Sequence, residues 1–221
     1  MPAMPTITTA SVWMPKGLCI GYQKTRIAET SEEMTLGSGT HYLLARNGRG
    51  KTTLLKTLSG LLKPVSGTYQ TKGHCQFVGD DLSFDRELSA TLIFRAFLSP
   101  KKRDEAVVLA EELELDVRKP FGQLSFGNRK KVGLVVSELT LDPGKAEILF
   151  YDEPFTGLDT PARLAILARW RRTENEAIRI VSCHPDFDAM EMPKALLIAD
   201  EKIFVAGDGT QTWADLKNLL T

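Results

Sequence analysis

The chain has 221 residues, 43% hydrophobic and 25% charged, and its 28 basic and 28 acidic residues leave a formal net charge of zero. This is an ordinary globular composition, and without the basic excess of a nucleic-acid binder we expect no nucleic-acid partner. The sequence has no apolar run of about 18 residues, so no membrane span is predicted, and its N-terminal residues lack the pattern of a secretory signal. The three cysteines, Cys19, Cys75 and Cys183, lack the spacing of a disulfide framework or a metal site, so we expect buried thiols in a reducing cytosol.

Short apolar runs alternate with amphipathic segments along the chain, which predicts an α/β fold with a sheet covered by helices. In the first part we expect a strand at 40–44, a helix at 51–61 and short strands at 68–71 and 76–78.

The middle of the chain is predicted to be helical, with helices at 90–98, 105–115 and 128–139. Strands return at 148–151, 178–182 and 196–199, a hairpin at 200–202 leads to a strand at 203–205, and a helix is expected at 212–220. The pattern predicts a single domain over 1–221, with a core at about 1–82 and 142–221 and a helical insert at about 83–141.

A phosphate-binding loop is predicted between the first strand and the first helix. Residues 45 to 53 read Ala-Arg-Asn-Gly-Arg-Gly-Lys-Thr-Thr, close to the pattern Gly-x-x-x-x-Gly-Lys-[Ser/Thr], with Ala45 in place of the first glycine. The glycines let main-chain N–H groups turn toward phosphate oxygens, and the helix adds the positive end of its dipole. Lys51 is expected to reach the β- and γ-phosphates, and the Thr52 hydroxyl to bind Mg²⁺. The nucleotide-binding residues predicted here are Asn47, Gly48, Arg49, Gly50, Lys51, Thr52 and Thr53.

Two carboxylates follow the apolar run at 148–151. A buried strand that ends in an aspartate holds Mg²⁺ in P-loop enzymes, so Asp152 is predicted as a metal ligand. Glu153 is placed to accept a proton from an attacking water. A solvated acidic turn would explain the pair alone, but it would not explain its occurrence together with Lys51 and Thr52.

The continuation of this segment resembles the ABC ATPase family. Asp-Glu-Pro at 152–154 is followed by Leu-Asp at 158–159, and the resemblance implies that Asp159 lies in a loop at a dimer interface. Leu-Ser-Phe-Gly-Asn at 124–128 is similar to the family signature Leu-Ser-Gly-Gly-Gln, although Phe126 and Asn128 depart from it. The resemblance implies that Ser125, Gly127 and Asn128 bind the γ-phosphate of an ATP held by the partner subunit.

Two further positions extend the resemblance, and a third position departs from it. His184, after the predicted strand at 178–182, is similar to the family histidine that contacts the γ-phosphate and braces the water, which makes Glu153, Lys51 and His184 the catalytic set. Tyr22 stands where the family has an aromatic ring on the adenine. The family glutamine that binds Mg²⁺ is replaced by Asp80-Asp81, and Asp81 (or Asp80) is expected to serve as the metal ligand instead.

The resemblance implies the P-loop fold of ABC ATPases, with a mixed sheet core, a small antiparallel β lobe and a helical insert. It implies an ATPase that uses ATP and Mg²⁺, pairs head to tail with a second ATPase subunit (two copies of this chain), and drives a separate integral-membrane permease from the cytoplasmic face of the membrane. The short length, with Glu-Leu-Ser-Ala at 87–90 and Asp-Glu-Pro-Phe at 152–155, is most similar to the haem-exporter ATPases of cytochrome c biogenesis and favours export, but other small exporter ATPases share these features.

Three other functions are weighed against this one. A regulatory subunit that binds ATP with little turnover is favoured by Ala45, Phe126, Asn128 and the missing glutamine, but the retained Lys51, Asp152, Glu153 and His184 argue against it. A non-transport ABC protein of DNA repair or the ribosome needs a long coiled coil or a second cassette, for which this chain has no room. A small-molecule P-loop kinase would not need the signature-like segment.

Overall fold

A sheet of eight strands forms the centre of the computed structural model, which describes residues 9–142, 144–183, 190–207 and 211–220. Its middle is parallel, in the order β11 (Ala195–Ala199), β5 (Gly39–Ala45), β9 (Ala177–Ser182), β8 (Glu147–Asp152) and β7 (His74–Val78). β8, β9 and β11 are buried at every residue, because helices cover both faces of the sheet.

The remaining strands make the sheet mixed and add two smaller sheets. β2 (Cys19–Tyr22), β3 (Thr25–Thr30) and β12 (Lys202–Val205) complete the eight-stranded sheet, and both the β2–β3 and the β11–β12 pairs are antiparallel. A small antiparallel sheet has the order β4 (Met34–Leu36), β1 (Ser11–Met14), β6 (Gln70–Lys72), and β10 (Glu191–Met192) pairs with β13 (Gln211–Thr212).

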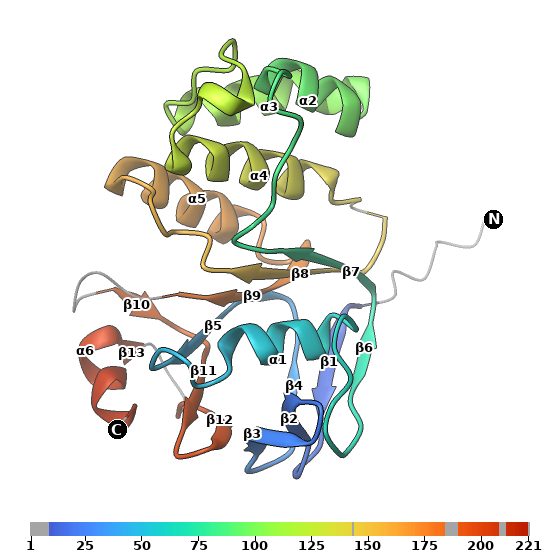
Figure 1. Cartoon of the computed structure of the whole chain (residues 1–221), viewed down its shortest axis with the longest axis vertical. Coiled ribbons are helices and arrows are strands. Elements are labelled where there is room, and N and C mark those ends of the chain that lie inside the picture. The colour runs from blue at the N-terminus through green and yellow to red at the C-terminus, as the bar shows by residue number, and fades with distance from the viewer. Residues whose placement is uncertain (1–8, 143, 184–189, 208–210, 221) are drawn as a thin grey trace, which may run out of the picture.

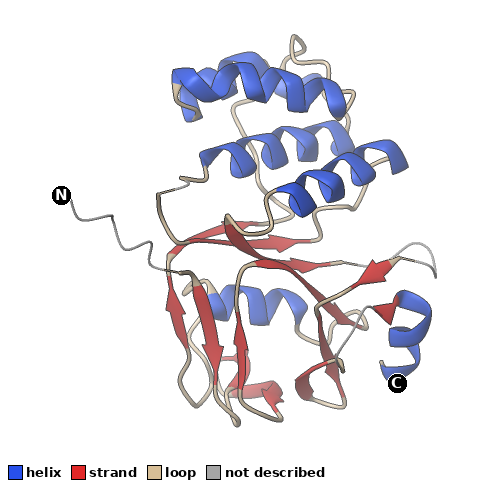
Figure 2. Ribbon diagram, turned by 180° about the vertical axis from the view of Figure 1, so that it is seen from behind, coloured by secondary structure: helices blue, strands red, loops and turns tan. Residues whose placement is uncertain are grey.

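The helices form layers on the two faces of the central sheet (Figures 1 and 2). α1 (Lys51–Leu58) lies on one face, between the central sheet and the small antiparallel sheet. α4 (Phe126–Thr140) and α5 (Thr160–Arg172) cover the other face, and α2 (Ala90–Phe97) and α3 (Pro100–Glu112) pack on α4. The short η1 (Phe121–Gln123), α6 (Trp213–Leu216) and η2 (Lys217–Leu219) complete the helices of the described residues.

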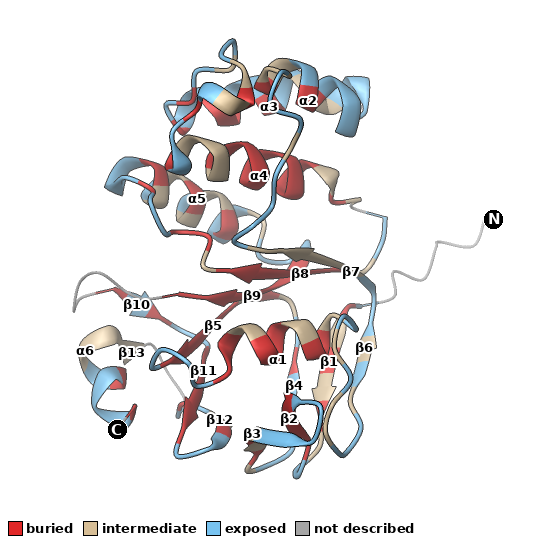
Figure 3. Ribbon diagram, viewed as in Figure 1, coloured by how far each residue is buried: buried red, intermediate tan, exposed pale blue. Residues whose placement is uncertain are grey.

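Burial follows this layering, as Figure 3 shows: the central strands and the middle of α4 are buried, whereas the outer surfaces of α2 and α3 are exposed. One hydrophobic cluster joins α4 and α5 to the sheet, and a second surrounds α1. No helix in the described part of the chain is long and apolar enough to cross a membrane.

The predicted fold class, a mixed sheet with a small antiparallel sheet and covering helices, is confirmed. Several details were wrong. The strand expected at 68–71 is shifted to Gln70–Lys72, and the helix expected at 105–115 begins at Pro100, a residue suited to a first helical turn. The helix expected at 212–220 is divided into α6 and η2. Cys19 and Cys183 are buried thiols as expected, but Cys75 is partly exposed.

A buried charge pair fastens α4 to the sheet. The Glu138 and Arg179 side chains are both 0% exposed, and two guanidinium nitrogens of Arg179 donate to the carboxylate at 3.0 and 2.9 Å. The Tyr151 hydroxyl and the Trp170 indole N–H donate to the same carboxylate, each at 2.7 Å. Donors from β8, α5 and β9 therefore satisfy Glu138 fully, which makes the C-terminal half of α4 part of the core.

We expect Arg179→Met to lower the free energy of unfolding by about 3–5 kcal/mol, because the buried Glu138 carboxylate would then keep only Arg169, whose Nε lies 3.7 Å away, as a cationic neighbour. Urea denaturation followed by circular dichroism measures the change. Glu112→Gln is the matched control: it removes the 3.7 Å pair with Arg172, whose side chain is 62% exposed, and should cost less than about 1 kcal/mol. Equal losses in the two variants would contradict the structural role of the buried pair.

Candidate functional site

Two glycines turn the loop between β5 and α1. Gly48 has a φ of 75° and Gly50 a φ of 103°, a region that side chains disfavour. A Cβ at Gly50 would also stand 2.8 Å from the Ile27 side chain. Ala45, where the motif expects a first glycine, is instead a buried strand residue paired with Ile198. Alanine fits this position because it belongs to the strand rather than to the turn.

The loop lines a hollow of about 320 Å³ at the N-terminus of α1. Tyr22 stands at its edge with 46% of its surface exposed, so the ring is available to a ligand. Arg49 is absent from the lining, and its main-chain N–H donates to the Arg46 carbonyl oxygen at 3.2 Å. The hollow is lined by Tyr22, Ile27, Asn47, Gly48, Gly50, Lys51, Thr52, Thr53 and Glu153.

Lys51 joins the loop to the carboxylate that follows β8. Its side chain is only 8% exposed, and its Nζ donates to the Ala45 carbonyl oxygen at 3.3 Å. The same Nζ lies 3.5 Å from Oε1 of Glu153. The ammonium and the positive end of the α1 dipole therefore face the same hollow, an arrangement that attracts an anion such as a phosphate.

The Asp152 carboxylate connects α1, β8 and β9. The Thr52 hydroxyl donates to its Oδ2 and the Ser182 hydroxyl to its Oδ1, both at 2.8 Å. The Thr52 and Asp152 oxygens are hard ligands of the kind that Mg²⁺ prefers, so the pair fits the metal that the sequence predicts. Ser182 was missed by the sequence analysis. It could have been found by aligning the ends of the two apolar runs, because Asp152 and Ser182 are register partners.

Glu153 has an unusual backbone conformation, with a φ of 52°. Its N–H donates to the Ser182 hydroxyl oxygen at 2.9 Å, and the Thr156 hydroxyl donates to its Oε2 at 3.4 Å. Burial raises the pKa of the neighbouring Cys183 thiol to about 12, so this thiol stays protonated at neutral pH. The Glu153 carboxylate lines the hollow beside Lys51, and its role as a base stays a prediction.

The signature-like segment forms the N-terminus of α4. The Ser125 hydroxyl oxygen accepts the Asn128 N–H at 3.2 Å and caps the helix. Gly127 packs so closely on Gly157 that a Cβ there would stand 2.1 Å from the Gly157 carbonyl oxygen. Neither Ser125, Gly127 nor Asn128 lines the hollow of the phosphate loop in the same chain.

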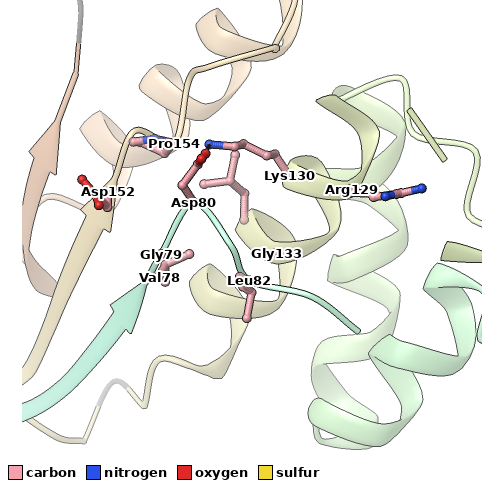
Figure 4. Close-up of a pocket in the computed structure, with 10 residues that line it drawn as sticks. Val78, Gly79, Asp80, Leu82, Arg129, Lys130, Gly133, Asp152 and Pro154 are labelled. Atoms are coloured by element: carbon pink, nitrogen blue, oxygen red, sulfur yellow. Dashed lines mark ion pairs between the residues drawn. The ribbon is translucent and has the colours of Figure 1, made fainter. Parts of the chain in front are cut away.

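The other predicted residues lie around this segment. Asp159 caps α5 by accepting the Ala162 N–H at 2.9 Å, and a hydrogen bond from Lys131 lowers the pKa of its carboxyl. Asp80 forms an ion pair with Lys130, as Figure 4 shows. The Asp81 carboxylate lies against Gly79, where a Cβ added to the glycine would stand 2.6 Å from its Oδ1. The role of Asp81 as a metal ligand stays a prediction. His184 lies outside the described residues.

The fold and the site define a class of protein. A glycine-rich turn between a parallel strand and a helix, with a lysine at the helix start and an aspartate at the end of a neighbouring strand, is the architecture of P-loop nucleoside triphosphatases. The chain belongs to the ABC transporter family, because the sequence pattern of that family matches residues 33–156.

Individual relatives agree with this assignment. The chain is 29% identical to ABC transporter G family member 20 of Dictyostelium discoideum, over 87% of this chain and 29% of that protein. It is 30% identical to the cytochrome c biogenesis ATP-binding export protein CcmA of Zymomonas mobilis, over 67% of this chain and 66% of that protein. A solved structure, a putative ABC transporter ATP-binding protein from Pyrococcus furiosus, is similar at 26% identity with a TM-score of 0.67, covering 80% of this chain and 92% of that one.

Several of the similar proteins are longer than the matched region. The chain spans 29% of the Dictyostelium protein, and 48% and 52% of two further curated relatives. The chain therefore matches only a part of each of these proteins.

We expect Ser182→Ala to raise the Mg²⁺ concentration needed for half-maximal ATP turnover about 10- to 100-fold, because Asp152 loses a partner that orients it. Titrating Mg²⁺ at fixed ATP gives this concentration. Ser59→Ala is the matched control, since the Ser59 hydroxyl donates only to the Lys56 carbonyl oxygen at the end of α1. A Ser182→Ala requirement within about twofold of the parent's would contradict the orienting role.

Proposed function

We propose that this chain is an ATP-hydrolysing subunit that powers an ABC transporter. The observation that carries the proposal is the convergence of Lys51, Thr52, Asp152 and Glu153 at one end of the parallel sheet, beside the phosphate loop. Membership of the ABC transporter family supports the same function.

The residues divide the chemistry among them. The main-chain N–H groups of the loop and Lys51 would bind the triphosphate, and Tyr22 stands at the rim of the hollow for the adenine. Thr52 and Asp152 would hold Mg²⁺, which when bound neutralises charge on the phosphates. Glu153 would accept a proton from the attacking water while Lys51 stabilises the charge that develops on the γ-phosphate. We assign His184 to the bracing of that water by the family resemblance.

We expect Glu153→Gln to lower the rate of Mg²⁺-dependent ATP hydrolysis about 10²- to 10⁴-fold, because an amide cannot accept the proton from water. ATP binding should be kept, since the phosphate loop is unchanged, and fluorescent-nucleotide titration measures it. Thr156→Ala is the control: it removes a long hydrogen bond to Glu153 without removing the base. ATP binding without turnover in parent and mutant alike would favour the alternative, a regulatory subunit with little hydrolysis.

The second part of the proposal is a head-to-tail dimer of two copies. Ser125, Gly127 and Asn128 lie outside the hollow of their own chain, and Phe126 beside them is 50% exposed. These residues therefore suit an ATP bound by another copy, where Ser125 would add a hydroxyl and a helix N-terminus to the γ-phosphate. Asp159, half exposed at the start of α5, would lie at the same interface.

Mixing two inactive variants tests this arrangement. We expect Lys51→Ala and Ser125→Arg each to abolish hydrolysis alone, and an equal mixture to recover about a quarter of the parent rate, because half of the dimers are mixed and one of their two sites is intact. Hydrolysis by the mixture is measured against each variant at the same total concentration. An inactive mixture would contradict a site shared between two copies.

The third part of the proposal is a membrane permease docked on the helical insert at 83–141. Leu92 and Phe97 of α2 are exposed apolar residues on this part of the chain, at 45% and 56%. Such docking would hold the chain at the cytoplasmic face of the membrane. The relative CcmA is named an export protein, which supports export, and the permease would select the substrate.

A further inference from the structure

The Lys130 ammonium contacts three different groups. It lies on α4, two residues after the signature-like segment, and its side chain is only 9% exposed. Its Nζ donates to the Glu153 carbonyl oxygen at 2.5 Å and forms an ion pair with the Asp80 carboxylate after β7. It also lies 5.3 Å from the centre of the Phe126 ring, within the range of a cation–π contact.

Figure 4 shows how the contact is made. The Lys130 side chain runs from α4 toward the loop after β8, and its end meets Asp80 beside Pro154. Burial removes most of the water that would otherwise compete for the ammonium, and Asp80 balances its charge. A charge-assisted hydrogen bond to a carbonyl oxygen in this setting is stronger and shorter than one between neutral groups.

The main chain of Glu153 is thereby held on both sides. Its N–H donates to the Ser182 hydroxyl oxygen at 2.9 Å, and its carbonyl oxygen accepts from Lys130. Its φ of 52° lies in the left-handed region, which is unfavourable for a residue with a side chain, and the two hydrogen bonds help to hold the backbone there. This conformation sets the direction of the Glu153 side chain, which reaches the hollow beside Lys51.

We propose that Lys130 is a positioning residue for hydrolysis: it fixes the backbone of Glu153 so that the carboxylate faces the γ-phosphate, and it ties that backbone to the signature-like segment. The inference rests on the proposed function, in which Glu153 is the base. Lys130 touches neither ATP nor water in this role. Its loss should therefore slow the chemical step and leave ATP binding in place.

Lys130→Met tests the proposal, because it removes the charge and keeps most of the apolar stem. We expect kcat to fall roughly 10- to 100-fold with KM for ATP within about twofold of the parent's. Lys130→Arg keeps the charge and should give a rate above that of Lys130→Met. Lys119→Met is the matched control, since this insert lysine makes only an exposed 3.7 Å pair with Asp116.

The other outcomes decide against the proposal. A kcat for Lys130→Met within about twofold of the parent's, or an Arg variant no faster than the Met variant, would overturn the positioning role. A fall in kcat accompanied by an equal rise in KM and a lower melting temperature would show general support of the fold instead. If Glu153→Gln abolishes hydrolysis and Lys130→Met does not slow it, the role of Lys130 is contradicted and the proposed function stands. If the parent protein shows no hydrolysis, the proposed function is contradicted and this inference with it.

Discussion

The Asp152 carboxylate is the interaction on which the geometry of the site depends. It accepts hydroxyl hydrogen bonds from Thr52 on α1 and from Ser182 on β9, so one group fixes the phosphate loop, β8 and β9 relative to one another. The Ser182 hydroxyl oxygen also accepts the Glu153 N–H, which extends the same network to the residue that we propose as the base. This arrangement requires the parallel register that pairs Asp152 with Ser182. If β8 slipped by one residue relative to β9, the two side chains would lie on opposite faces of the sheet and could not meet.

The sequence predicted the parts of the site that are local along the chain. The phosphate loop and the carboxylates after β8 were found because a turn, a helix start and a strand end each have their own residue pattern. Ser182, Lys130 and the Glu138–Arg179 pair were not, because their roles depend on which faces meet after folding. α5 was missed although Asp159 and the proline at 161 mark its start, since Asp159 was assigned to an interface loop alone.

The departures from the family pattern have structural settings of their own. Ala45 ends a regular strand, so the loop turns without a glycine there. Phe126 replaces a small residue of the signature, and its ring packs on Gly157 and against the Lys130 ammonium. Asp80, in the region of the missing glutamine, binds that same ammonium. Phe126 and Asp80, two of the departures, therefore both contact Lys130. Asp80 is a structural partner of that lysine, and Asp81 is left as the predicted metal ligand.

The attachments at the two ends of α4 differ in their burial. At its C-terminal half, Glu138 and Arg179 are completely buried, and separating such a pair costs about 3–5 kcal/mol. At its N-terminal half, the side chains of Lys130 and Lys131 are only 9% and 4% exposed, but their partners Asp80 and Asp159 are 56% and 50% exposed. The signature-like segment is therefore attached through carboxylates that solvent reaches, whereas the C-terminal half of α4 is fixed in the core by a pair that solvent does not reach.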